Sequence, residues 1–467
     1  MLFPSISFLF YFLPGVLLAY FLVPARYKNG VLLIASLFFY FYGEPKYVLL
    51  LVLASISGYF HGLWINKLRG GRYAVIPLIS SIIVGLSGLL YFKYTNFFIV
   101  NINSLFGSNL AVLKQVLPIG ISFYTFQILS YTIDVYRGGI GVQRKLLDFM
   151  TYVSLFPQLI AGPVVRYATV EGQLNKRNHS VKDMASGINR FIVGLAKKVI
   201  IANTLGELGQ IFLQLDEKTV LFYWIFAVAF MLQIYFDFSG YSDMAIGLGR
   251  IFGFHFLENF NYPFMAKNMT EFWRRWHISL GTWFRNYVYI PLGGNRVSTL
   301  KWIRNVFVVW FLTGFWHGAQ WNFVAWGLYF AMFLVLEKVA LNHILERLPV
   351  FLRHFYLLFF VLISFVIFNA DGLSESLNNL KGMFGFLEIP FSGAETIYYL
   401  KSYSLVFLGA IVSATPLMKD LVTTLVSHKW VKTAFYTATP FMQLVLLLVI
   451  TGYLVDSSFN PFLYFRF

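Results

Sequence analysis

Apolar and polar residues alternate in blocks along this chain: long apolar stretches are separated by short segments that hold most of the charged residues. Within a block, apolar and polar positions do not alternate one by one, which favours helices over half-buried strands. A backbone in lipid must satisfy its hydrogen bonds internally, and about 20 residues of helix cross a bilayer. We therefore expect an all-α, polytopic integral membrane protein with about ten to twelve segments that cross or enter the membrane. The expected segments are residues 5–23, 31–42, 47–65, 74–92, 116–136, 150–167, 188–202, 220–238, 321–336, 355–368, 404–418 and 440–453.

Two of these segments contain residues that interrupt a straight helix. Segment 116–136 has Pro118 and Gly120 near its start and a buried-looking Gln127 further on, whereas segment 150–167 contains two prolines around an Ala-Gly pair. Proline removes a backbone donor and clashes with the preceding helical turn. Irregular backbone at membrane depth is tolerated only where protein or a water-filled cavity covers it. Both segments are therefore predicted to be broken or re-entrant.

One uncharged stretch contains a histidine. Between Arg304 and Glu337 there is no Lys, Arg, Asp or Glu, and the stretch is longer than the about 20 residues of a single span. It is predicted to form either one long tilted helix or two segments broken near Gly314 and Gly318. His317 lies near its middle, and an ionisable side chain at that depth is a functional-site candidate. The alternative is a neutral histidine that hydrogen-bonds between packed helices.

The composition agrees with a membrane protein and excludes several classes of site. Hydrophobic residues make up 58% of the 467 positions and charged residues 12%, against about 25% charged in soluble domains. The mean hydropathy is +0.68. The net charge of +16 lies in short clusters between apolar blocks, which indicates the positive-inside bias of a protein in a lipid bilayer and no nucleic-acid partner. The chain has no cysteine, so disulfides and thiolate chemistry are excluded, and no metal site is expected.

The residues around the first apolar block and some charged residues in later blocks predict how the chain is oriented and anchored. No basic region precedes the first block, so we interpret it as a true span, and Arg26 and Lys28 after it predict a cytoplasmic first loop. Asp237 and Asp243 are six positions apart and do not share a helical face, so they are expected to cap or anchor helices. The Lys197–Lys198 pair is expected at a cytoplasmic edge, where long side chains extend toward water.

The stretch from residue 268 to residue 330 concentrates Arg, Trp and His in three motifs. The first reads Asn-Met-Thr-Glu-Phe-Trp-Arg-Arg-Trp-His and ends at His277. The second reads Tyr-Ile-Pro-Leu-Gly-Gly-Asn-Arg and ends at Arg296. The third reads Thr-Gly-Phe-Trp-His-Gly-Ala-Gln-Trp-Asn and ends at Asn322. Dense aromatic rings and cations are typical of a membrane interface.

On these motifs the chain resembles the membrane-bound O-acyltransferases. Within them it is similar to the bacterial branch of alginate O-acetylase, which also holds the peptidoglycan and cellulose O-acetylation subunits and the D-alanyl transferase of teichoic acids. The segments that carry the resemblance are residues 118–138, 156–167, 235–247, 271–296, 315–326 and 462–467.

The resemblance implies a fold and a location. It implies a ring of tilted transmembrane and re-entrant helices around a central tunnel that crosses the bacterial plasma membrane. The chain would form one integral domain, residues 1–467, with a core of about residues 116–330 and a C-terminal aromatic motif at residues 462–467. His317 matches the catalytic histidine of the family, and His277 matches a second histidine position of the bacterial branch.

The resemblance also implies a donor substrate and a set of residues that contact it. The acyl donor would be a cytoplasmic thioester, acetyl-CoA in the first place, and no cofactor would stay bound. Guanidinium groups at the cytoplasmic mouth of the tunnel would hold its phosphates, although each arginine could equally be a positive-inside anchor. The candidates for the mouth and tunnel are Arg274, Arg275, Arg285, Arg296, Trp316, Asn322 and Gln127.

The aromatic residues at the end of the given sequence suggest how the acyl group could reach the outside of the membrane. It resembles a short C-terminal motif of this branch, so Tyr464 could accept the acyl group and pass it to a partner; the alternative is an interfacial aromatic anchor. No extracytoplasmic segment is large enough to bind a polymer. A separate extracytoplasmic SGNH or esterase-like acetyltransferase is therefore expected as a partner.

Taken with the residue chemistry, the resemblance implies O-acetylation of an exported polysaccharide such as alginate or peptidoglycan. A histidine in a low-dielectric site is pushed toward its neutral form, which a general base requires; a covalent acyl-histidine is a less favoured route. The alternatives are a lipid-linked sugar transporter or flippase, D-alanyl transfer to teichoic acid, and a structural scaffold. Transporters commonly show internal repeats and ionisable residues spread over several spans, and neither pattern is visible here.

Overall fold

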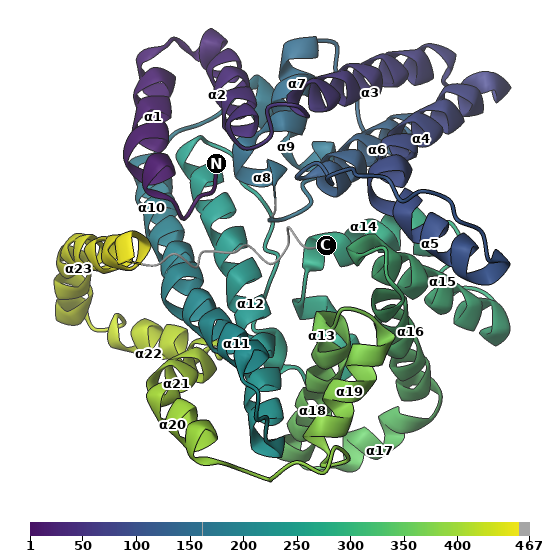
Figure 1. Cartoon of the computed structure of the whole chain (residues 1–467). Helices are drawn as coiled ribbons and strands as arrows, with labels where there is room; N and C mark the ends of the chain where they lie inside the picture. The colour runs from purple at the N-terminus through teal and green to yellow at the C-terminus, as the bar shows by residue number, and fades with distance from the viewer. Residues whose placement is uncertain (161, 457–467) are drawn as a thin grey trace. The chain divides into compact units, whose positions relative to one another are not determined.

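The computed structural model describes residues 1–160 and 162–456, and every regular element in this part of the chain is a helix, as expected. The described residues form two compact units. The first combines Met1–Phe191 with Ser242–Leu257, and the second combines Ile192–Tyr241 with the residues from Glu258 onward. Figure 1 follows the helices along the chain by colour.

Six described helical segments are long and apolar enough to cross a membrane. They are Val48–Leu68, Arg72–Phe106, Val220–Ile251, Trp321–Arg347, Val350–Asn369 and Lys429–Asp456. The helices Ala394–Ser402 and Ser404–Ser413, bent by 50°, would make a seventh span. The about ten to twelve segments expected from the sequence included segments that enter the bilayer without crossing it. Several of those fold as shorter or broken helices.

In the first unit, α3 (Val48–Leu68) packs against both α4 (Val75–Leu89) and α6 (Ile121–Arg137), which lie side by side in Figure 1. Gly58 and Gly62 lie on the packed face of α3, where an added Cβ would overlap Ile128 and Tyr131 of α6. Small residues let two helix backbones approach closely in a membrane protein. The remaining helices of this unit are α1 (Leu13–Leu22), α2 (Lys28–Gly43), α5 (Thr95–Phe106), α7 (Leu146–Ser154), α8 (Phe156–Leu159), α9 (Tyr167–Asn175) and the first part of α10 (Val181–Ala196).

The two predicted interruptions have different outcomes. Helix α6 is continuous from Ile121 to Arg137, and Pro118 and Gly120 precede it, so the interruption expected in segment 116–136 lies before this helix and not within it. Gly120 is at the N-cap with φ 77°, a conformation that glycine adopts without a Cβ clash. Segment 150–167 is broken as predicted: α7 ends at Ser154, α8 is a short helix with a proline in its first turn, and α9 begins only at Tyr167.

Helix α12 (Val220–Ile251) holds two acidic residues that anchor it, as the sequence predicted. In the first unit, Asp243 accepts hydrogen bonds from Arg190 of α10 at 2.8 and 3.0 Å. In the second unit, Asp237 forms an ion pair with Lys198 at 2.5 Å. The expectation that Lys198 extends toward water is wrong, because its side chain is 3% exposed and that of Asp237 is 1% exposed. A buried ammonium group is stable there because a carboxylate lies beside it.

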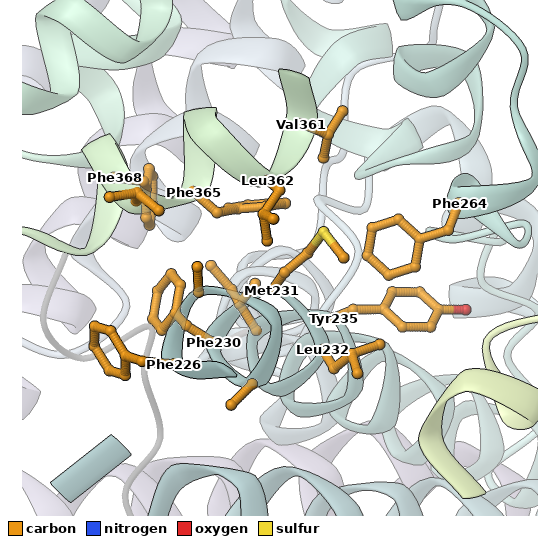
Figure 2. Close-up of a cluster of buried hydrophobic side chains, with 14 of the residues drawn as sticks. Phe226, Phe230, Met231, Leu232, Tyr235, Phe264, Val361, Leu362, Phe365 and Phe368 are labelled. Carbon is orange, nitrogen blue, oxygen red and sulfur yellow. The ribbon is translucent and has the colours of Figure 1, made fainter. Parts of the chain in front are cut away.

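The core of the second unit forms between α12 and α18 (Val350–Asn369). Figure 2 shows Phe230 of α12 opposite Phe365 of α18, and Tyr235 of α12 beside Phe264. Burial of each large apolar side chain contributes about 1.5–3 kcal/mol. This core fixes the segment around Phe264, which leads directly into α13 (Met269–Arg275).

The uncharged stretch forms two packed helices, α15 (Thr299–His317) and α16 (Trp321–Leu336), broken at residues 318–320 as one of the two predictions stated. Gly314 and Gly327 face each other across the pair, and a Cβ on either would overlap a backbone carbonyl of the other helix. His317 is the last residue of α15. The amide of Asn322 at the start of α16 donates to the carbonyl of Ala370, 2.7 Å away, just after α18.

The second unit is completed by shorter helices and by a longer C-terminal helix. Pro440 lies inside α23 (Lys429–Asp456), so the expected segment 440–453 was too short at its N-terminal end. A proline is tolerated within a membrane helix when nearby groups satisfy the freed carbonyl. The other helices of this unit are α11 (Thr204–Gln214), α14 (Ile278–Phe284), α17 (Asn342–Arg347), α19 (Leu373–Met383), α20 (Ala394–Ser402), α21 (Ser404–Ser413) and α22 (Leu417–Leu425).

Candidate functional site

Two histidines predicted from the sequence come together in the second unit around one tryptophan. His277 lies between α13 and α14 and is 1% exposed; His317 ends α15 and is 4% exposed. The ring of Trp316 lies 6.2 Å from the ring of His277 and 5.1 Å from that of His317, measured between centroids. The structure therefore places His277, Trp316 and His317 in one buried aromatic cluster.

Two further aromatic rings lie against His317. Trp326 of α16 is 5.0 Å from it and Phe368 of α18 is 5.4 Å from it, both edge-on. Trp326 is 2% exposed, and within the described residues its indole N–H has no acceptor. A buried N–H donor is costly to leave unbonded, and here it lies beside an imidazole. The sequence analysis missed Trp326; its position one helical turn after Asn322 was the available signal.

Asn259 determines which nitrogen of His277 carries the proton. The Oδ1 atom of Asn259 accepts hydrogen bonds from the backbone N–H of Ser279 at 3.2 Å and from its hydroxyl at 2.8 Å. A backbone N–H only donates, so this atom is the amide oxygen. Nδ1 of His277 lies 3.2 Å from the same oxygen and must donate to it. The lone pair of the neutral imidazole is therefore on Nε2.

The backbone and the burial of His277 both favour a fixed, uncharged ring. Its φ of 44° and ψ of 51° place it in the left-handed region, which a residue with a side chain seldom adopts. Burial lowers the pKa of His277 to about 3. The ring is therefore neutral at physiological pH and can accept a hydrogen bond at Nε2.

A cavity of about 580 Å³ lies beside His277 within the second unit. Its lining includes the cations Arg274, Arg285 and Lys338 and the aromatic residues Trp273, Tyr289, Trp302 and Trp310. Along α15 it is lined by Val306, Val309, Trp310 and Thr313. His317 follows Thr313 by four positions, so it lies on the same face of α15, one turn further on. A volume of this size is typical of small-molecule sites.

Comparison with known proteins agrees with these motifs. The model of the membrane-bound O-acyltransferase family, MBOAT, matches residues 105–377, more than half of the chain. A probable alginate O-acetylase of Pseudomonas aeruginosa is 44% identical over 391 residues, which cover 83% of this chain and 75% of the relative. A probable alginate O-acetylase of Pseudomonas putida is 39% identical over the whole of both chains, and the peptidoglycan O-acetyltransferase of Helicobacter pylori is 34% identical over 98% of this chain and 90% of its own.

The chain belongs to the membrane-bound O-acyltransferase family. It is therefore an O-acyltransferase and a multi-pass membrane protein. Family membership favours acyl transfer over the transporter and scaffold alternatives. The matched residues contain both histidines and every residue named as lining the cavity.

The remaining predicted site residues of this acyltransferase lie in different places. Arg275 is not among the residues that line the cavity and forms an ion pair with Glu271 at 2.8 Å. Arg296 is exposed in a turn and does not line the cavity either. Gln127 belongs to the first unit, where its side chain is fully buried in α6. Tyr464 lies outside the described residues.

Glu337 is a structural support of the site that the sequence analysis did not recognise. Its buried carboxylate accepts hydrogen bonds from the backbone N–H groups of Met269 at 2.6 Å and Thr270 at 3.2 Å. The hydroxyls of Thr270 and Tyr356 also donate to it, at 3.2 and 3.3 Å. These bonds fix the start of α13, the helix that carries Arg274. The available signal was that Glu337 is the first charged residue after the uncharged stretch.

Proposed function

We propose that this acyltransferase transfers an acetyl group from cytoplasmic acetyl-CoA to an exported polysaccharide of the alginate or peptidoglycan type, at the bacterial plasma membrane. The acceptor class follows from the relatives, which are named alginate O-acetylase and peptidoglycan O-acetyltransferase. The observation that carries the proposal is the cavity lined by exposed cations and by the buried His277, with His317 one helical turn beyond the lining residue Thr313 on α15.

The lining of the cavity suits a thioester donor that carries phosphate groups and an adenine ring. Arg274 and Arg285 are exposed at the cavity and can form charge-assisted hydrogen bonds with phosphate oxygens. The ammonium group of Lys338 lies 3.9 Å from the ring centre of Trp302, so a cation and a flat apolar surface are available together. An adenine ring can stack on such a surface. The donor is a substrate, and the reaction as proposed needs no resident cofactor.

In the proposed reaction, His317 acts as a general base. An imidazole nitrogen takes the proton of the acceptor hydroxyl while that oxygen attacks the thioester carbonyl carbon. The tetrahedral intermediate then collapses, the C–S bond breaks, and the imidazolium gives its proton to the departing thiolate, which leaves as the thiol. The indole N–H of Trp326 beside His317 is the candidate donor for the charge that develops on the carbonyl oxygen. His277 would accept a hydrogen bond at Nε2 and orient a substrate.

Transfer to the polymer would involve a separate extracytoplasmic SGNH or esterase-like acetyltransferase. Tyr464 stays a hypothesis as an acyl relay between His317 and that partner. The Tyr464→Phe variant removes only the hydroxyl oxygen that would hold the acetyl group. Unchanged acetylation of the polymer in cells carrying this variant would rule the relay out.

A comparison of two acetyl thioesters tests the donor assignment. Purified protein should release thiol from acetyl-CoA much faster than from the acetyl thioester of N-acetylcysteamine, which lacks the phosphates and the adenine. Replacing Arg274 and Arg285 with glutamine should remove most of this preference, because each charge-assisted hydrogen bond contributes about 1.5–3 kcal/mol. The matched control is Arg296→Gln, whose guanidinium group lies outside the cavity lining.

Two results would contradict the assignment of acetyl-CoA as the donor. If both thioesters react at the same rate in the wild type, the cavity does not recognise the coenzyme. If only a D-alanyl thioester on a carrier protein is consumed, the substrate is that of the teichoic acid branch.

A further inference from the structure

Three basic side chains converge on one buried tyrosine in the first unit. Tyr20 lies in the last turn of α1 and is 0% exposed; its hydroxyl donates to the carbonyl of Phe252 at 2.8 Å. The same oxygen accepts from Nε of Arg177 at 3.1 Å and lies 3.0 Å from Nε2 of His179. The ammonium group of Lys28 lies 4.7 Å from the centre of the Tyr20 ring. We call Lys28, Arg177 and His179 the basic cluster.

No carboxylate balances the basic cluster. Among residues 1–160 and 162–456, none of its three side chains takes part in an ion pair. Asp183, which follows on the same segment, lies 4.0 Å from His255 instead. Burial first, and then the positive charges of Lys28 and Arg177, lower the pKa of His179. The positive charges of the basic cluster repel one another, and a bound anion would reduce this repulsion.

The surface next to the basic cluster is apolar. On α1, Leu18 is 65% exposed, Phe21 is 40% exposed and Leu22 is 80% exposed. Lys28 follows within one short turn, and its ammonium group also lies 5.3 Å from the ring centre of Phe21. An exposed apolar helix face that ends at a group of cations matches a molecule with an acyl chain and a phosphate headgroup.

We propose that the basic cluster binds the phosphate of an anionic phospholipid whose acyl chains lie along Leu18 and Leu22 of α1. Arg177 and His179 are already oriented by their contacts with the Tyr20 hydroxyl, so little side-chain freedom is lost on binding. A free phosphate ion would match the cations and leave the exposed leucines uncovered. The bound lipid would hold the loop before α2 against the segment at residues 177–179.

Melting experiments with added lipid test the site. Wild-type protein in a neutral detergent is titrated with phosphatidylglycerol, with phosphatidylcholine and with inorganic phosphate, and the unfolding midpoint is measured. Phosphatidylglycerol should raise the midpoint, because a ligand that binds the folded state stabilises it. The Lys28→Gln variant should bind it about fivefold more weakly, and adding Arg177→Gln should weaken it by a further similar factor.

The matched control is the double variant Lys67→Gln with Arg72→Gln, two exposed basic residues in the last turn of α3 and just after it. It should keep the full response to phosphatidylglycerol. Lys28→Gln decides the test even if the double variant of the basic cluster does not fold, because the Lys28 ammonium group lies over the faces of Tyr20 and Phe21 and is in none of the ion pairs of the described residues. An unchanged response in Lys28→Gln overturns the proposal. So does an equal response to phosphatidylcholine or to phosphate alone.

Discussion

The His317→Ala variant should lose acyl transfer almost completely while remaining folded. A general base contributes about 10²–10⁴-fold to the rate, and the rings of Trp316, Trp326 and Phe368 that lie against His317 carry no basic group. The measurement is the initial rate of thiol release from acetyl-CoA by purified protein. Alanine also leaves a gap in a packed site, so His317→Gln, which fills more of that volume, should show the same loss.

Two controls separate loss of chemistry from loss of structure. His343→Ala removes an exposed histidine of α17 and should leave the rate unchanged. The unfolding midpoint of His317→Gln should stay close to that of the wild type. A folded His317→Gln variant that retains most of the wild-type rate would show that another group is the base.

The Lys198→Met variant should destabilise the protein by about 3–5 kcal/mol. Its ammonium group pairs with Asp237 at 2.5 Å, and both side chains are almost fully buried. Removing the cation takes away the ammonium group that pairs with this buried carboxylate. The result should be visible as a large drop in the unfolding midpoint or in the yield of folded protein.

A double variant tests the cause of that loss. Lys198→Met combined with Asp237→Leu should recover much of the stability, because apolar replacement of a whole buried pair is often neutral. Arg275→Met is the matched surface control: it breaks the partly exposed pair with Glu271, for which a change of about 0.3–0.5 kcal/mol is expected. If the double variant is no more stable than Lys198→Met, the unpaired carboxylate is not the cause.

The sequence predicted the parts of the fold that depend on local pattern. Long apolar blocks predicted helices, and glycine at position 318 marked the end of α15. The error at Lys198 has a different origin, since its partner Asp237 lies on another helix and a lysine in an apolar block is by default expected to extend toward water. Likewise, the apolar segment expected at residues 440–453 is only part of α23, which begins at Lys429 and contains Pro440.

The candidate site was predictable where a motif identified it. His277, His317, Arg274 and Arg285 lie in segments 271–296 and 315–326, which carry the family resemblance, and the structure places both histidines against Trp316. Asn259, Trp326 and Glu337 were missed because each acts through a contact with a distant segment: Asn259 with His277, Trp326 with His317, and Glu337 with the start of α13. No local spacing indicates such contacts.

The central claim is that an acetyl group passes from a thioester on one side of the membrane to a hydroxyl acceptor on the other. Sealed proteoliposomes test it directly, with radiolabelled acetyl-CoA on one side only and the acceptor, with the extracytoplasmic partner, on the opposite side. We predict that label reaches the acceptor across the sealed bilayer and that His317→Gln prevents this. Label that reaches the acceptor only when both substrates are on the same side would contradict the account.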